Sequence, residues 1–286
     1  MPSATDLREV LPTDDEVTLY RERGWYVSRR IISDEVLEAA ALGSERYYAG
    51  HIDDGPEIHG QHLPTSPPPP GLRKNDYASL RCRPLAALVR VPAIAAIAAR
   101  LSGAGGLRLW HDQLLYKPPS APDVVGNVGW HTDRSYWKAC SSSEMLTAWV
   151  PFHTITLEHG PLMMIEGSNR WGDEQTGKPD FFRQDLATQE EEISREAGRK
   201  ITKVPVLLER GQVSFHHCRT FHGSGPNHTT EPRRSLAIHL QPSDNRASGA
   251  LDASGHLIHH ASNDLVRWTD GLPDYTDPRY CPTLLP

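Results

Sequence analysis

The pattern of hydrophobic and polar positions divides the chain into a helical first third and a strand-rich remainder. Residues 13–24 begin with acidic residues and end at a glycine, which predicts a helix, and Ser33 starts a second helical pattern. Residues 84–102 carry small apolar side chains at helical spacing and predict a helical pair. Residues 51–71 include four consecutive prolines and are predicted to form a loop.

From residue 107 onward, short stretches alternate between bulky apolar and polar residues, which is typical of strands. A polar and charged segment, residues 172–200, interrupts them, and we expect either a solvated helix or a lid there. Helices followed by many short strands favour an α+β chain whose core is a β-sandwich or barrel. The predicted strands are residues 107–116, 125–130, 145–152, 160–168, 204–208, 212–216 and 235–240.

Composition and charge narrow the class of protein. The 286 residues suffice for one large β domain with additions or for two small domains. A net charge of −6 with scattered basic residues gives no support for nucleic acid as a partner. The four cysteines form no CxxC pair, which fits free thiols in a reducing compartment. Because no apolar run approaches a membrane span and no signal-peptide pattern is present, we expect a cytoplasmic protein without a membrane partner.

The candidate chemistry centres on residues 129–137, where His131 and Asp133 stand two residues apart. In an extended backbone, residues at this spacing point to the same face. The best candidate for a third ligand is His222, which opens a Gly-Ser-Gly segment. Two histidines and one carboxylate on one side of a metal, with the other positions open, suit non-haem Fe(II) oxygenases. With 15 histidines in the chain a lone pair is a weak signal, but a strand-like stretch before it and an aromatic run after it strengthen the prediction.

The order of these residues resembles that of a known family. His131-x-Asp133, then His222-Gly-Ser-Gly-x-Asn, then Arg233 is similar to the pattern of the phytanoyl-CoA dioxygenase family, the PhyH family of Fe(II)/2-oxoglutarate-dependent oxygenases. Residues 166–170 resemble the family's Pro-Gly-Ser-His turn, with Glu for Pro and Asn for His. The resemblance covers most of the chain, and the combined pattern is more specific than any of its parts.

The resemblance implies a mainly β fold with flanking helices, a double-stranded β-helix of the jelly-roll, cupin-like type. We expect a single dioxygenase domain over residues 1–286. Its mostly helical part is predicted over 1–106, and the jelly-roll core over 107–245 includes the segment 172–200 as an insertion or lid. Residues 246–286 are predicted to form a C-terminal extension.

The resemblance also implies roles for individual residues. His131, Asp133 and His222 would bind Fe(II) and form the catalytic centre. Because related halogenases replace this carboxylate by a small residue, Asp133 indicates hydroxylation or a related oxidation instead. The cosubstrates would be 2-oxoglutarate and O2, and the products would include succinate and CO2.

Four residues fall at positions that bind 2-oxoglutarate in the family. Gln113 and Trp149 would line its pocket, whereas Ser224 and Arg233 would hold its distal carboxylate. Arginine suits this task because its planar guanidinium meets a carboxylate with two parallel hydrogen bonds. Arg234 is the neighbouring alternative, and the family spacing favours Arg233.

Other residues have two open interpretations. Trp137 and Tyr136 are candidates for the substrate pocket, as is Trp130, and core packing is the alternative for each. Lys117 and Arg73 are either further cosubstrate contacts or ordinary surface cations. The histidines near the third ligand, His216, His217, His228 and His239, are predicted to be partly buried and hydrogen-bonded, with a second metal site as the alternative.

The predicted function is hydroxylation of an unactivated C–H bond in a small molecule, for which a natural-product intermediate is one candidate. Because no clear basic patch for the phosphates of coenzyme A is visible, the sequence favours a free small molecule over an acyl-CoA. The alternatives are a non-redox cupin-like isomerase or hydrolase and a jelly-roll binding protein without turnover. Arg233 speaks against the first alternative and the complete set of three ligands against the second.

Overall fold

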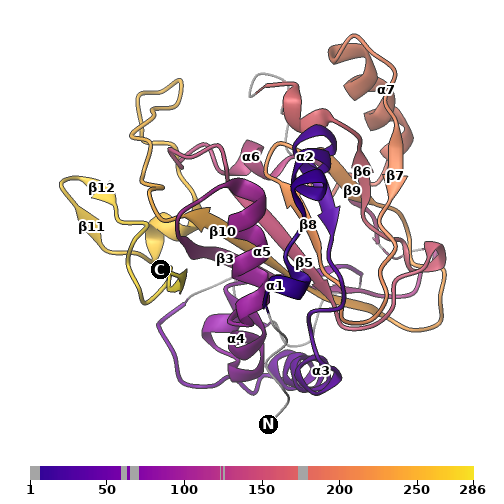
Figure 1. The fold of residues 1–286 in the computed structure, drawn as a ribbon, viewed down its shortest axis with the longest axis horizontal. Coiled ribbons are helices and arrows are strands. Elements are labelled where there is room, and N and C mark those ends of the chain that lie inside the picture. Colours follow the sequence, from indigo (N-terminus) through magenta and orange to yellow (C-terminus); the bar gives the residue numbers. More distant parts are fainter. Residues whose placement is uncertain (1–6, 59–62, 65–70, 123, 125, 173–179) are drawn as a thin grey trace.

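The computed structural model describes residues 7–58, 63–64, 71–122, 124, 126–172 and 180–286. Within these ranges the core consists of two antiparallel sheets that face each other (Figure 1). The larger sheet contains β1 (Trp25–Val27), β8 (Ser214–His217), β5 (Leu146–Pro151), β10 (Arg233–Pro242), β3 (Leu107–Lys117) and β13 (Thr283–Leu285) in this order, with β2 (Arg73–Asp76) also paired to β3. The smaller sheet contains β4 (Val128–His131), β9 (His222–Ser224), β6 (Met163–Ile165) and β7 (Lys203–Pro205) in this order.

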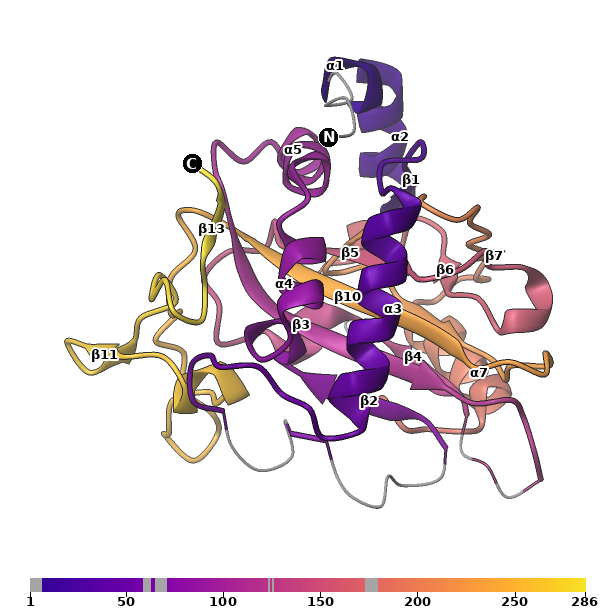
Figure 2. The same ribbon diagram turned by 90° about the horizontal axis from the view of Figure 1, so that it is seen from below.

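Four helices cover the outer face of the larger sheet (Figure 2). Their ends follow local sequence signals: the Thr13 side chain and Glu16 form a capping box at the first, which ends at Gly24 with φ of 87°. The four are α2 (Asp14–Arg23), α3 (Asp34–Tyr48), α4 (Arg83–Val89) and α5 (Pro92–Ser102). The remaining described α-helices are α1 (Leu7–Val10), α6 (Asp133–Tyr136) and α7 (Leu186–Glu196).

The two faces of strand β10 contact different parts of the protein: one packs against the helices, and the other faces the space between the two sheets. Leu236, Ile238 and Leu240 belong to the core that the larger sheet shares with the helices. The intervening Ala237 packs instead with Trp149 in a separate cluster between the sheets. Since side chains alternate along a strand, a slip of one residue would exchange the two faces. The apolar alternation therefore fixes which residues of β10 face the interior between the sheets.

The structure confirms the predicted helices and most of the predicted strands, with differences in extent. The strand predicted at 160–168 is limited to β6, because residues before it form a 3-10 turn that ends at Gly160 with φ of 59°. The strand predicted at 204–208 is wrong beyond Pro205, because Leu208 makes only an isolated bridge. Strands β2, β9 and β13 were not predicted. The proline-rich part of the predicted loop, residues 65–70, and residues 59–62 lie outside the described residues.

Residues 246–286, predicted as a C-terminal extension, form a segment with two features that the sequence did not predict. It contains a hairpin formed by β11 (Trp268–Thr269) and β12 (Leu272–Pro273). It also buries Tyr275 against Trp110, with ring centres 4.5 Å apart. Neither feature has an apolar period that a sequence pattern reveals. No single described helix is long and apolar enough to cross a membrane, and α4 and α5 meet that test only together, with a 40° bend between them.

Asp112 is a buried carboxyl group on β3. It accepts hydrogen bonds from the backbone N–H of Ser79 at 3.0 Å and from the Ser79 hydroxyl at 2.6 Å. Burial raises the pKa of Asp112 to about 7, because desolvation disfavours the charged form. The folded state therefore binds the proton more tightly than the unfolded chain does. The stability that Asp112 contributes is fully present below the ordinary pKa of 3.8 and is lost as pH rises through about 7.

We therefore expect the Asp112→Asn variant to gain stability relative to the wild type between about pH 4 and about pH 8, by about 1–3 kcal/mol at the upper end. Urea unfolding at several pH values measures this difference. Asp244→Asn removes an exposed carboxyl group and serves as the control. A difference between wild type and Asp112→Asn that does not change with pH would contradict the prediction.

Candidate metal centre

The smaller sheet brings His131 and His222 together. His131 is the last residue of β4 and His222 the first of β9, and the two are opposite each other in the antiparallel register. Their ring centres are 4.2 Å apart. Asp133 completes the group, and one ligand atom from each of the three buried residues lies within 4.8 Å of the others.

The sequence argument for His131 and Asp133 was wrong about the backbone. Strand β4 ends at His131, and Thr132 caps α6 by accepting a hydrogen bond from the backbone N–H of Ser135. Asp133 is therefore the first residue of a helical turn and does not share one extended face with His131. The turn nevertheless brings its carboxylate to the same point.

Backbone carbonyls orient both imidazoles for metal binding. His131 Nδ1 lies 2.7 Å from the carbonyl oxygen of Gly129, and His222 Nδ1 lies 3.0 Å from that of Thr220. A carbonyl only accepts, so each Nδ1 carries the hydrogen and each Nε2 retains a lone pair. Burial lowers the pKa of both histidines, which keeps the rings neutral. Neutral imidazoles with fixed tautomers are good metal ligands.

The carboxylate of Asp133 is held in a similar way. The Thr147 hydroxyl donates to Oδ2 at 2.6 Å, and His216 Nε2 lies 3.3 Å from the same oxygen. Burial alone would raise the pKa of Asp133, but the neighbouring imidazoles of His222 and His216 keep it well below its usual range. The three residues thus offer two neutral nitrogens and one anionic oxygen, a donor set that fits Fe(II) with open positions. Sequence reasoning did not assign Thr147 or His216 to the site.

A cavity of about 540 Å³ opens beside this group. His131 and Asp133 form part of its wall, and so do three residues that the sequence nominated, Gln113, Tyr136 and Trp137. Trp137 is buried, whereas Tyr136 is 36% exposed and its hydroxyl accepts a hydrogen bond from the backbone N–H of Phe181 at 3.1 Å. Burial raises the pKa of Tyr136 to about 12, so the phenol stays protonated.

Trp130 does not line this cavity. It packs with Ile165, Ile193 and Phe221 in a core beneath α7. Its backbone N–H donates to the Gln189 side chain at 2.7 Å, and its indole N–H donates to Glu190 at 3.0 Å. Trp130 is therefore a core residue that holds α7 against β4.

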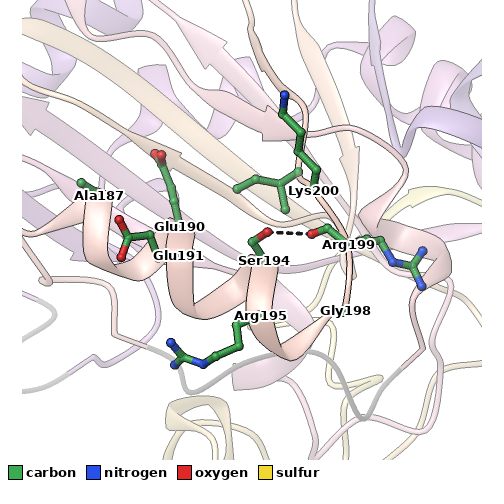
Figure 3. Close-up of a pocket in the computed structure, with 9 residues that line it drawn as sticks. Ala187, Glu190, Glu191, Ser194, Arg195, Gly198, Arg199 and Lys200 are labelled. Atoms are coloured by element: carbon green, nitrogen blue, oxygen red, sulfur yellow. Dashed lines mark hydrogen bonds between the residues drawn. The ribbon is translucent and has the colours of Figure 1, made fainter.

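A second hollow, of about 680 Å³, lies beside α7 and is shown in Figure 3. The Ser194 hydroxyl there donates to the carbonyl oxygen of Arg199 at 2.7 Å. Acidic and basic side chains are mixed in its lining, and none of the nominated site residues is among them. The charged lining residues are Glu190, Glu191, Arg195, Arg199 and Lys200.

Two buried cations lie together on the interior side of the larger sheet. Lys117 on β3 and Arg233 on β10 are opposite each other in the strand register, and both are almost completely buried. Lys117 Nζ donates to the Ser224 hydroxyl at 2.6 Å and to the carbonyl of Gly225. Arg233 donates to the carbonyl of Gly160. Among the described residues, no carboxylate pairs with either cation.

Burial dominates the electrostatics of this pair. It lowers the pKa of Lys117 well below the usual range, with a further contribution from Arg233, and it lowers the pKa of Arg233 to about 9. The guanidinium carbon of Arg233 lies 5.3 Å from the ring centre of Trp149. Arg233 Nε has no hydrogen-bond partner in the part of the chain that the structure describes. Such a group is suited to binding an anion.

The other nominated cations lie elsewhere. Arg234 is on the opposite face of β10 and forms an ion pair with Glu45 of α3. Arg73 lies over the rings of Tyr116 and Tyr48, with its guanidinium carbon 4.5 and 5.5 Å from their centres. Alternation along β10 therefore separates Arg233 from Arg234, as the sequence spacing favoured.

A family model described as Phytanoyl-CoA dioxygenase (PhyH) matches residues 61–235, which is more than half of the chain. The chain belongs to the phytanoyl-CoA dioxygenase (PhyH) family. The matched range includes His131, Asp133 and His222. The predicted family is thereby confirmed.

Two curated relatives illustrate the range of the family. The chain is 29% identical over 142 residues to a probable alpha-ketoglutarate-dependent hypophosphite dioxygenase of Stutzerimonas stutzeri. The aligned region covers 48% of this chain and 46% of the relative. The chain is 32% identical over 136 residues to the ectoine dioxygenase of Halomonas elongata, which covers 44% and 41%. The chain thus spans about half the length of the curated relatives it matches or less.

Solved structures that align with this PhyH-family protein support the fold. The epimerase SnoN in complex with Fe3+, alpha ketoglutarate and nogalamycin RO aligns with a TM-score of 0.66 at 24% identity, over 95% of this chain and 98% of that one. EctD from S. alaskensis with 2-oxoglutarate and 5-hydroxyectoine aligns with a TM-score of 0.63 at 21% identity, over 83% and 78%. The predicted jelly-roll, cupin-like fold with flanking helices is confirmed.

Proposed function

We propose that this protein is an Fe(II)- and 2-oxoglutarate-dependent dioxygenase that oxidises a C–H bond of a small molecule. Relatives in its family are named as dioxygenases that depend on alpha-ketoglutarate or act on ectoine. In the proposed assignment His131, Asp133 and His222 hold the iron. When bound, Fe(II) and 2-oxoglutarate would supply the oxidising power, with O2 consumed and succinate and CO2 released.

The observation that carries the proposal is the buried cation pair next to the metal group. His222 and Ser224 are two residues apart on β9 and point to one face, roughly 6–7 Å apart along the strand. Ser224 in turn accepts the hydrogen bond from Lys117, which is paired in register with Arg233. A dicarboxylate with one end at the metal therefore meets two cations at its other end.

The remaining residues position the cosubstrate and exclude water. The Trp149 ring packs against the guanidinium of Arg233 and is itself buried. Gln113 lies on the cavity wall, two positions along the register from the β3–β10 pair that carries His111 and His239. A non-redox isomerase or a silent binding protein has no use for two buried cations beside a metal group. This arrangement therefore favours the oxygenase over both alternatives.

The experiment is an anaerobic titration. We expect the protein loaded with Fe(II) to develop a weak visible absorption band when 2-oxoglutarate is added, because a keto acid bound at the iron would give a charge-transfer absorption. Succinate, which has both carboxylates but no keto group, is the control and should give no band. Admission of O2 should then convert 2-oxoglutarate to succinate. If iron binds and no band forms, the non-redox alternative takes the place of this proposal.

A further inference from the structure

Four histidines outside the metal group line the 540 Å³ cavity, and three of them cluster on one wall. His111 on β3 and His239 on β10 are opposite each other in the strand register, with ring centres 4.3 Å apart. The ring centre of His260, from the C-terminal segment, lies 5.2 Å from that of His111. The three do not bring their nitrogens close enough to form a metal site, because the described residues contain only the group of His131, Asp133 and His222.

The tautomer of His239 follows from its neighbours. Thr147 has one hydroxyl hydrogen and donates it to Asp133 at 2.6 Å, since a carboxylate only accepts. The same hydroxyl lies 2.7 Å from His239 Nδ1, so it must accept a hydrogen from that nitrogen. Burial keeps the ring neutral by lowering the pKa of His239 to about 4. Its Nε2 therefore carries a lone pair and seeks a donor.

No described residue uses that lone pair. His239 is 3% exposed, and its Nε2 has no hydrogen-bond partner among the described residues. His111 is 4% exposed and, in the same described set, has no partner at either nitrogen. Buried polar groups are nearly always paired, and an unpaired one destabilises the fold. Two such side chains facing one cavity indicate a ligand that pairs with them.

His260 adds a donor to this wall. Its Nδ1 accepts a hydrogen bond from the backbone N–H of Ser262 at 3.1 Å. The hydrogen of the neutral ring is therefore on Nε2. The wall thus offers an acceptor at His239, a donor at His260 and one of each at His111. A hydroxyl group, which both donates and accepts, matches this combination.

The rest of the cavity favours a molecule with rings and without negative charge. Aromatic side chains provide flat surfaces, among them Tyr77, Trp137 and Phe181. Lys74 is the one lysine or arginine among the described lining residues, and it forms an ion pair with Asp76 at 3.2 Å. The described lining residues therefore offer no free lysine or arginine for the phosphates of an acyl-CoA or for another anionic substrate.

We propose that His111 and His239 form a substrate subsite that binds a hydroxyl group of a ring-containing small molecule without negative charge. This inference rests on the proposed dioxygenase function, because the subsite would hold a C–H bond of that molecule beside the iron. The chain His239–Thr147–Asp133 connects the subsite to a metal ligand and fixes the distance between the two. A hydroxyl bound at His239 thus selects which carbon faces the metal centre.

The test uses three probes that share one bicyclic skeleton: decahydro-2-naphthol, its methyl ether, and decahydro-2-naphthoate. Binding to the full-length protein loaded with Fe(II) and 2-oxoglutarate is measured by anaerobic calorimetry. We expect the alcohol to bind at least about tenfold more tightly than the ether, since the ether cannot donate to His239. The carboxylate should bind no better than the ether.

Two substitutions at one position separate hydrogen bonding from shape. His239→Phe should remove the preference for the alcohol, whereas His239→Gln, which keeps an acceptor oxygen, should retain it. His256→Phe alters an exposed histidine outside the cavity lining and should leave all three affinities unchanged.

The absorption band of the same samples keeps this proposal distinct from the proposed function. If the band is absent in the wild type, the dioxygenase proposal fails together with its substrate subsite. If the band forms and the alcohol does not bind, or binds no better than the ether, only the subsite is overturned. An unchanged preference in His239→Phe would also overturn it.

Discussion

The His222→Ala variant is expected to lose iron-dependent conversion of 2-oxoglutarate to succinate by more than about 100-fold. Changes in residues that merely orient metal ligands already cost about 10–100-fold, and His222 is proposed as a ligand itself. Its removal leaves His131 and Asp133, which form an incomplete set. Iron content after anaerobic loading and desalting, together with succinate formation, measures the effect.

His228→Ala is the matched control for this variant. His228 lies six residues further along the chain and is exposed, so the prediction that it is partly buried is wrong. It should retain the iron content and turnover of the wild type. Full turnover in His222→Ala would show that the metal is bound elsewhere, and iron binding without turnover would restrict the role of His222 to catalysis.

The Arg233→Met variant is expected to bind 2-oxoglutarate about 10–100-fold more weakly. The guanidinium is almost completely buried, and no described carboxylate neutralises it or Lys117. The incoming anion would therefore meet a concentrated positive charge that water does not screen. Titration of the anaerobic absorption band gives the dissociation constant directly.

The neighbouring residue provides a strict control. Arg234→Met removes an equal charge one position away, but Arg234 faces α3 and pairs with Glu45. Its dissociation constant for 2-oxoglutarate should stay within about twofold of the wild type, as for a partly exposed ion pair. Heat denaturation adds a second readout: 2-oxoglutarate should raise the melting temperature of Arg234→Met but hardly that of Arg233→Met. Equal behaviour of the two variants would remove Arg233 from the proposed site.

Local signals in the sequence sufficed for the helices and for the candidate ligands. Thr13, Ser33 and Gly24 mark helix ends through their own backbone chemistry, so a short window predicts them. His131 and Asp133 likewise stand in one short motif, and His222 was nominated from its own Gly-Ser-Gly segment. The error about His131 and Asp133 arose because the short motif does not say where β4 ends.

The histidine wall could not be predicted in this way. His111 and His239 meet only because β3 and β10 pair in one particular register, and a slip of one residue would turn His239 toward the helices. A signal was nevertheless present: His111, Gln113 and Lys117 are separated by even numbers of residues along β3, so their side chains point to the same face. Because Gln113 was predicted to line the 2-oxoglutarate pocket, this alternation also predicts that His111 and Lys117 face the interior.

The C-terminal segment contributes to the cavity but not to the proposed iron site. Every proposed iron and 2-oxoglutarate contact comes from residues 107–242, whereas His260 reaches the cavity from a later segment that packs against β3 through Tyr275 and Trp110. Exchanging that later segment would reshape what the cavity accepts and leave the oxidising centre in place. The part of the cavity around His260 can therefore change with that segment alone, whereas the proposed subsite of His111 and His239 stays with the iron contacts on the two sheets.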